Sequence, residues 1–211
     1  EFFATENDLQ QAVIAAYSGL SLPGSFHRIS MVGFEQFSDN VYHGSSTTDG
    51  AHATWTTFNY DPNSENIERT YESFYQLINM CNQVITRGPE ADVSQEVLTQ
   101  ALAEVTFLRG FAHFMLTLIW GEAPIVTTLP EDPAGFAPEA SSATALYEQA
   151  ITDLQFAEAN LSPTAAQGGR VTSWAAKAML AKVYLFGADE VGRVEWYDLA
   201  QAKASEVIEN G

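Results

Sequence analysis

The sequence predicts a mainly α-helical protein: a helical-repeat scaffold with a long irregular loop insertion that is rich in aromatic residues. Two observations predict the scaffold. Apolar residues recur every three or four positions through most of residues 65–211, which is the spacing of one helix face. Segments that contain glycine or proline separate these stretches and divide them into helices. A third observation predicts the insertion, because residues 24–64 carry many aromatic side chains without a helical period.

The first expected element is an amphipathic helix over residues 5–20. Thr5 is a suitable N-cap, and Asp8 three residues later completes a capping box. Gly19 and the following Leu22-Pro23-Gly24 end the helix. Its apolar face consists of Leu9, Val13, Ala16 and Leu20.

The loop insertion follows over residues 24–64. Glycines interrupt its runs of Ser, Thr, Asn and Asp. Its aromatic residues are scattered without helical spacing: Phe26, Phe34, Phe37, Tyr42, Trp55, Phe58 and Tyr60. Loops of this length inside a compact domain usually carry function. We therefore expect the ligand site to lie in this region.

Two long helices come next. The first begins at residue 65 and is stopped by Gly88-Pro89, and the second runs from about Ser94 to Trp120. The stripe of the first helix is Ile67, Tyr71, Phe74, Ile78, Cys81 and Ile85. The stripe of the second is Leu98, Leu102, Val105, Leu108, Ala112, Met115 and Ile119. Such stripes indicate helices that pack one face into a core.

The remainder is a proline-rich connector over residues 121–141, extended only near residues 123–128, and then helices over residues 143–161, 173–187 and 196–209. Helix pairs with Ala, Tyr and Leu at regular offsets look like degenerate tetratricopeptide units, whose ideal period is about 34 residues. The period here is irregular. Because a helical repeat ends in a polar capping helix and the last helix carries Ala and Leu on more than one face, we expect the natural protein to continue beyond Gly211.

Composition excludes several classes of protein. The chain of 211 residues has 9 Lys and Arg against 27 Asp and Glu, a formal net charge of −18. Scarce bases argue against a nucleic acid partner and against docking of the folded domain on an anionic membrane. No uninterrupted apolar run is long enough to span a bilayer. The single cysteine, Cys81, excludes an intramolecular disulfide and a cysteine-based zinc cluster, and we expect it in the core.

Five segments, in order, resemble the SusD/RagB family of Bacteroidetes outer-membrane nutrient-binding lipoproteins. They are Tyr71–Asn82, Glu104–Gly110, Trp120–Pro124, Asp153–Pro163 and Gly169–Leu185. The family's usual residues are Trp at position 71, Ala at position 110 and Arg at position 182, where this chain has Tyr, Gly and Lys. The resemblance covers the N-terminal, tetratricopeptide-bearing part of proteins that are usually more than twice this length. It implies one domain over residues 1–211, incomplete at its C-terminus.

The resemblance also implies a function. Such a protein captures oligosaccharides at the cell surface and delivers them to a SusC-like TonB-dependent outer-membrane transporter, as part of polysaccharide utilization. It is not an enzyme and has no cofactor, and it touches the membrane only through an N-terminal lipid anchor, whose cysteine lies outside this sequence. A peptide-binding lid of the RagB type and a tetratricopeptide-type interaction scaffold without a small ligand are the alternatives.

Trp55 is the foremost candidate for ligand binding, because an indole offers a flat platform for the apolar face of a sugar ring. Neighbouring polar side chains can bind the hydroxyl groups, and the resemblance places an acidic dipeptide of the ligand loop at Asp39-Asn40. The remaining candidates are Tyr42, Asn59, Tyr60 and Asn66. Two structural alternatives stay open: Trp55 anchors the loop onto the helices, and Asp39-Asn40 forms a turn.

Other polar residues are assigned structural roles. Asp61, Asn63, Glu65 and Glu72 fall in a calcium-loop register, but Pro62 and Asn66 depart from it, so a helix start capped by Ser64 is preferred and no metal site is predicted. Arg109 and Arg170 are expected to pair with carboxylates that fix the helix packing. His113 is expected to be a satisfied, partly buried histidine, and Lys177 and Lys182 to be solvated. The sequence has no G-x-S-x-G nucleophile elbow, no P-loop and no G-x-G-x-x-G motif, so no catalytic residue is predicted.

Overall fold

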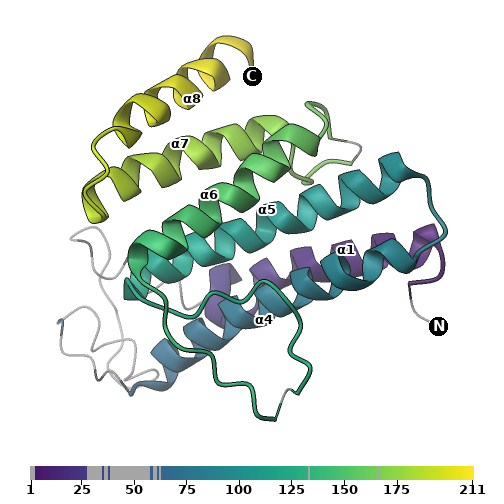
Figure 1. Cartoon of the computed structure of the whole chain (residues 1–211), viewed down its shortest axis with the longest axis horizontal. Coiled ribbons are helices and arrows are strands. Elements are labelled where there is room, and N and C mark those ends of the chain that lie inside the picture. Colours follow the sequence, from purple (N-terminus) through teal and green to yellow (C-terminus); the bar gives the residue numbers. More distant parts are fainter. Residues whose placement is uncertain are drawn as a thin grey trace.

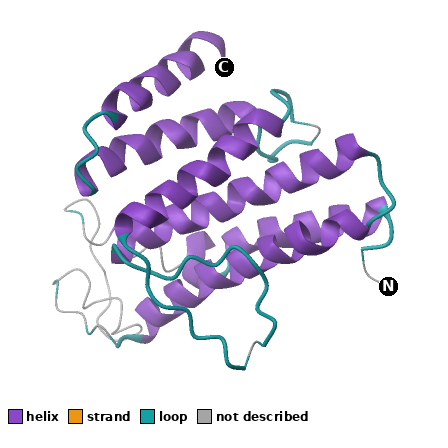
Figure 2. Ribbon diagram, viewed as in Figure 1, coloured by secondary structure: helices purple, strands orange, loops and turns teal. Residues whose placement is uncertain are grey.

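The computed structural model describes residues 3–27, 35, 38, 58, 61, 63–132, 134–165 and 167–211. Within these residues the chain is helical, with an isolated antiparallel bridge between Ala123 and Ser141 as the described β-pairing (Figure 2). The long helices are α1 (Glu6–Ser18), α4 (Glu65–Arg87), α5 (Gln95–Trp120), α6 (Ala143–Asn160), α7 (Ser173–Glu190) and α8 (Trp196–Asn210). Short turns of helix cover Gly19–Ser21, Pro23–His27 and Gly88–Glu90.

The helices are stacked in chain order. From α4 to α8 each helix runs antiparallel to the one before it and packs against it, and α1 lies against α4 and α5 (Figure 1). This arrangement confirms the predicted mainly α-helical scaffold. The stacked antiparallel pairs are consistent with tetratricopeptide-like repeats, and that finer assignment stays a prediction.

Hydroxyl side chains begin the long helices from α1 to α7, whereas α8 has no side-chain cap. The Thr5 hydroxyl accepts a hydrogen bond from the Asp8 N–H at 3.3 Å, and an Asp8 carboxylate oxygen accepts one from the Thr5 N–H at 2.9 Å, so the predicted capping box is present. Ser64 accepts from the Ile67 N–H and caps α4, as expected. The next three helices also begin with a hydroxyl that accepts a hydrogen bond from a backbone N–H. These N-caps are Ser94, Ser142 and Thr172. Each cap satisfies one of the amides that a helix leaves unpaired at its start.

Helix α5 is the centre of the core. By length and composition alone it could cross a membrane, but 78% of its most apolar 18-residue window is buried inside the domain, as in the core helix of a globular protein. It approaches α6 closely at Gly110, where an added Cβ would lie 2.8 Å from the Asp153 Cβ. Cys81 of α4 is fully buried, which confirms its predicted place in the core.

Two predicted helix ends are corrected. α1 ends at Ser18 rather than near residue 20, because the chain tightens into the turn Gly19–Ser21. α7 continues to Glu190, beyond the expected end at residue 187. Gly187 is a buried helical residue there, and an added Cβ would lie 2.6 Å from the Trp196 ring, so this glycine permits α8 to pack closely.

Candidate functional site

Both described ends of the predicted ligand loop are fixed at α4. At the first end Gly24 lies against α4 so closely that a Cβ would come within 2.0 Å of the Arg69 carbonyl oxygen. Phe26 then packs between Phe74 and Phe111, with ring centroids 6.3 and 5.4 Å away. The loop therefore leaves the scaffold where α4 and α5 pack together, and it returns at the first residues of α4.

The returning end is organised by local hydrogen bonds. An Asp61 carboxylate oxygen accepts from the Asn63 N–H at 2.9 Å, Ser64 caps α4, and Glu65 forms an ion pair with Arg69. These contacts agree with the helix-start interpretation of this acidic segment. No cluster of three or more potential metal-ligating His, Cys, Asp or Glu side chains occurs in the part of the chain that the structure describes.

Asn66 is the predicted ligand residue that the structure describes. It is 7% exposed on the inner side of α4, and its Nδ2 has no hydrogen-bond partner among the described residues. Buried amide donors usually have a partner, so Asn66 beside the loop ends stays a predicted ligand residue. The other candidates lie outside the described residues and stay predictions: Asp39, Asn40, Tyr42, Trp55, Asn59 and Tyr60.

A group of three aromatic rings lies beside the loop ends, and the sequence analysis missed it. Tyr71 of α4 contacts Tyr75 at 4.7 Å between centroids and Trp120 of α5 edge to face at 5.1 Å. The Tyr75 hydroxyl donates to the Pro124 carbonyl oxygen at 2.7 Å, and burial raises the pKa of this tyrosine. All three side chains are partly exposed, so their rings offer amphipathic surface of the kind that sugars stack against.

A signal for this group was present in the sequence. Tyr71 and Tyr75 are four residues apart, so they share one side of α4. Trp120 lies at the end of the next helix, where an antiparallel arrangement returns to the first turns of α4. The sequence analysis instead places Tyr71 in the apolar stripe and gives Tyr75 no binding role.

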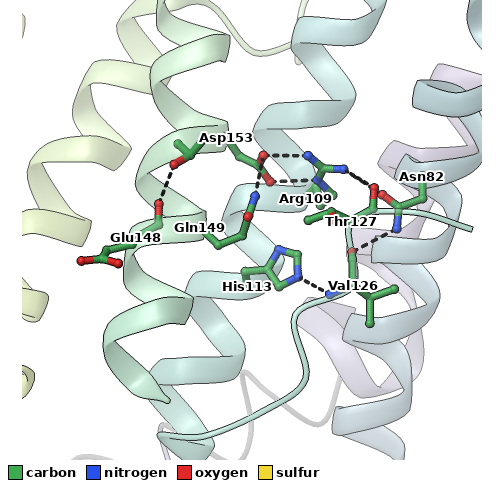
Figure 3. A network of polar contacts seen from close by, with 9 residues as sticks. Asn82, Arg109, His113, Val126, Thr127, Glu148, Gln149 and Asp153 are labelled. Carbon is green, nitrogen blue, oxygen red and sulfur yellow. Dashed lines mark hydrogen bonds and ion pairs between the residues drawn. The ribbon is translucent and has the colours of Figure 1, made fainter. Parts of the chain in front are cut away.

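A buried polar network fixes the connector that follows α5 (Figure 3). Arg109 donates two hydrogen bonds to the Asp153 carboxylate, at 2.9 and 2.7 Å, and its Nη1 donates to the Asn82 Oδ1 and the Thr127 carbonyl oxygen, both at 2.9 Å. The Asn82 Nδ2 donates to the Val126 carbonyl oxygen at 3.0 Å. One guanidinium thus joins α4, α5, α6 and the connector, which confirms the predicted structural role of Arg109.

His113 belongs to the same buried region. Its Nε2 accepts a hydrogen bond from the Val126 N–H at 3.4 Å, and its Nδ1 has no partner among the described residues. Burial, followed by the charge of Arg109, lowers the pKa of His113 to about 3, so the ring is neutral at physiological pH. His113 is fully buried rather than partly buried, and among the described residues the Val126 N–H to its Nε2 is the hydrogen bond that its ring makes.

A second buried charge pair lies at the other end of α5. Arg170 donates to the Glu104 carboxylate at 3.2 Å, and the same carboxylate accepts from the Tyr17 hydroxyl at 2.8 Å. The Tyr17 oxygen in turn accepts from the Val171 N–H at 3.0 Å, and burial raises the pKa of Tyr17. The predicted structural pairing of Arg170 is therefore confirmed.

One prediction about charged surface residues is wrong. Lys177 was expected to be solvated, but it is partly buried, pairs with Glu206 and Glu158, and lies 4.8 Å above the Trp174 ring. The cause is the packing of α8 on α7, which brings Glu206 to it. Lys182 is exposed, as expected.

The described architecture is a helical scaffold: stacked helices tied by buried ion pairs, with three partly exposed aromatic rings at one end. Residues 4–185 match a family model described as "SusD-like_3: Starch-binding associating with outer membrane". The chain belongs to the SusD-like family.

Relatives extend this likeness. A SusD-like protein of Bacteroides ovatus is 31% identical over 185 residues, covering 79% of this chain and 33% of that protein. A SusD-like protein P25 of Formosa agariphila is 24% identical over 197 residues, covering 87% of this chain and 37% of that protein. The chain thus spans about a third of the length of these curated relatives.

Solved structures share the fold. A laminarin-binding SusD-like protein superposes with a TM-score of 0.81 at 26% identity, over 97% of this chain and 44% of that one. A structure with a xylogluco-oligosaccharide superposes with a TM-score of 0.78 at 29% identity, over 94% of this chain and 40% of that one.

Proposed function

We propose that this protein captures neutral oligosaccharides at the cell surface and delivers them to a TonB-dependent outer-membrane transporter. The observation that carries the proposal is membership of a family described as starch-binding and associating with the outer membrane. Two solved relatives are named for laminarin binding and for a xylogluco-oligosaccharide. Because these two relatives differ in the glycan, we propose a class of ligand, neutral oligosaccharides, and not one sugar.

The charge of the chain favours a neutral ligand. With a formal net charge of −18, the protein repels uronate-containing or sulfated polysaccharides over distances up to the Debye length, about 8 Å in physiological salt. Sugar recognition then rests on aromatic stacking and on hydrogen bonds from neutral groups. Trp55 and the rings of Tyr71, Tyr75 and Trp120 would supply the stacking surface.

The two most deeply buried ion-paired carboxylates are unsuited to turnover. Glu104 and Asp153 are the carboxylates of the two buried charge pairs, with side chains that are each 3% exposed. Each is paired with an arginine. An acid or base for glycoside hydrolysis must reach the glycosidic oxygen or a water, so neither of these carboxylates could serve.

The test is calorimetry of the full-length mature protein with laminarin and xyloglucan oligosaccharides, together with the variant Trp55→Ala. Loss of one stacking platform is expected to weaken binding at least about tenfold, or about 1.4 kcal/mol. Trp174→Ala is the matched control, because Trp174 is also partly exposed and lies in the first turn of α7. That turn is at the end of the bundle remote from the start of α4, where the loop returns (Figure 1).

Three results would contradict parts of the proposal. Binding whose affinity and number of sites are unchanged in Trp55→Ala would remove this residue from the site. Saturable binding of peptides without glycans would favour the RagB-type alternative. Binding of neither class would leave an interaction scaffold.

Delivery and localisation need separate experiments. We expect the protein to co-purify with a transporter from outer membranes, and to be digested by protease added to intact cells if a lipid anchor places it on the surface. Retention in the periplasm, or purification without any outer-membrane transporter, would contradict this part of the proposal.

A further inference from the structure

A groove opens at the end of the bundle remote from the aromatic rings. It has a volume of about 750 Å³, within the roughly 300–1,000 Å³ typical of ligand pockets. Its walls are the start of α1, the first turns of α5 and the turn between α6 and α7, which meet at the right of Figure 1. Gln100 in its wall and Trp120 are 20 residues apart on α5, so about 30 Å of helix separates the groove wall from Trp120 in the group of aromatic rings.

Neutral hydrogen-bonding side chains dominate the groove. Eight of the lining residues are amides or hydroxyls: Gln10, Gln95, Thr99, Gln100, Asn160, Ser162, Thr164 and Gln167. Such groups both donate and accept hydrogen bonds, as sugar hydroxyls do. Val97 and Leu161 add apolar surface beside them, which can contact the C–H faces of sugar rings.

The charges of the groove exclude an anionic ligand. Arg170 is the basic side chain in the lining, and it is occupied by Glu104, which is 2% exposed. Glu104 also accepts from Tyr17 and from the Gln100 Nε2 at 3.2 Å, so the guanidinium is held in a completed network. Glu6 and Glu96, both exposed and also in the lining, would repel a phosphate or sulfate.

The wall of the groove is also ordered in advance. Gln100 donates to Glu104 and accepts from the Ser162 N–H at 3.2 Å, so this side chain ties the α6–α7 turn to α5. The side chains of Gln10 and Gln167 do not tie elements of the wall together, because neither has a hydrogen bond with another described residue. Their amides are available to a ligand. The wall held by Gln100 lowers the ordering cost of binding, whereas the free side chains of Gln10 and Gln167 are ordered only when a ligand binds.

We propose that this groove is a second binding site for a neutral oligosaccharide, about 30 Å along α5 from Trp120. The proposal rests on the proposed glycan-capture function and adds a site to it. A long polysaccharide chain that occupies both sites gains affinity through the raised effective concentration at the second site. A short oligosaccharide occupies each site independently and more weakly.

The test uses the full-length mature protein and the variant Gln10→Ala/Gln167→Ala, with Gln11→Ala/Gln201→Ala as the matched control. Gln11 is an exposed neighbour on α1 and Gln201 is exposed on α8, and neither lines the groove. Thr164→Trp is a second variant, designed to fill the groove. Circular dichroism and thermal melting verify that each variant is folded.

Calorimetry with laminarin and xyloglucan oligosaccharides counts the sites, and polysaccharide binding measures avidity. For the bound glycan we expect two sites per chain in the wild type and in the Gln11 control. We expect one site in both groove variants, with polysaccharide affinity lowered at least about tenfold. In the Trp55→Ala background the remaining weak site should disappear with Thr164→Trp.

Other outcomes overturn the inference and distinguish it from the proposed function. One site in the wild type, unchanged in the groove variants, would reject the groove and leave the proposed function standing. No glycan binding by any form would reject both. If the groove variants instead lose binding of a pentalysine peptide and keep all glycan sites, the groove is a site for cationic peptides and the glycan inference fails.

Discussion

Replacing Arg109 by leucine tests whether its buried network holds the scaffold together. The Arg109 and Asp153 side chains are 10% and 3% exposed, and two hydrogen bonds join them. Removing one partner of such a pair leaves an uncompensated buried charge, and typically costs about 3–5 kcal/mol. Arg109→Leu also leaves the Asn82 Oδ1 and the Thr127 carbonyl oxygen without this donor. For a domain of this size the melting temperature should fall by about 6–20 °C.

The assay is unfolding in guanidinium chloride, followed by far-ultraviolet circular dichroism. Arg69→Leu is the control, because its ion pair with Glu65 has side chains that are 46% and 74% exposed and is worth about 0–1 kcal/mol. Arg109→Leu/Asp153→Leu should be less destabilised than Arg109→Leu, since both charges are gone. If Arg109→Leu costs no more than the Arg69 control, the network does not fix the helices and the reasoning is wrong.

Two further predictions concern the same helix. Gly110→Ala should destabilise by about 1–3 kcal/mol, because its Cβ would lie 2.8 Å from the Asp153 Cβ and 3.1 Å from the Ala150 carbonyl oxygen. The matched change Gly168→Ala, where a Cβ meets nothing within 4 Å, should alter the unfolding free energy by less than about 0.5 kcal/mol, and equal costs would refute the close-contact argument. The pKa of His113 is lowered from 6.5 to about 3, so the unfolded chain binds a proton that the folded chain excludes. The unfolding free energy should therefore fall from pH 6.5 toward pH 3, by up to about 1.4 kcal/mol per pH unit, and His113→Gln should flatten this slope in denaturant titrations. An identical slope in His113→Gln would rule out this histidine as the cause.

Much of the fold could be predicted from the sequence because its signals are local. A hydroxyl N-cap and a stripe of apolar residues require only neighbouring positions, so Thr5 with Asp8 and Ser64 could be recognised directly. The pairing of Arg109 and Arg170 with carboxylates was also predictable, since few bases face many acids. Which carboxylates pair with these two arginines depends on the packing of α5 against other elements.

The rest depends on contacts between distant residues. Tyr71 and Trp120 are 49 positions apart, and only the packing of α4 on α5 brings their rings together. Lys177 meets Glu206 because α8 folds back onto α7, so its exposure could not be judged from α7 alone. The groove has the same origin, because its walls come from three separate parts of the chain. Local patterns contain no information of this kind.

The hydrogen bonds of Tyr17 have a consequence for how the molecule opens. In a linear repeat array each unit touches only its neighbours, so fraying can begin at either end. Here Tyr17 of α1 holds Glu104 of α5 and the backbone of Val171, which are far apart in the sequence. The α1 end can open only if these contacts with the middle of the array also break, whereas α8 packs chiefly on α7. Amide protons of α8 should thus exchange with solvent through small local openings, and those of α1 only through a larger cooperative one.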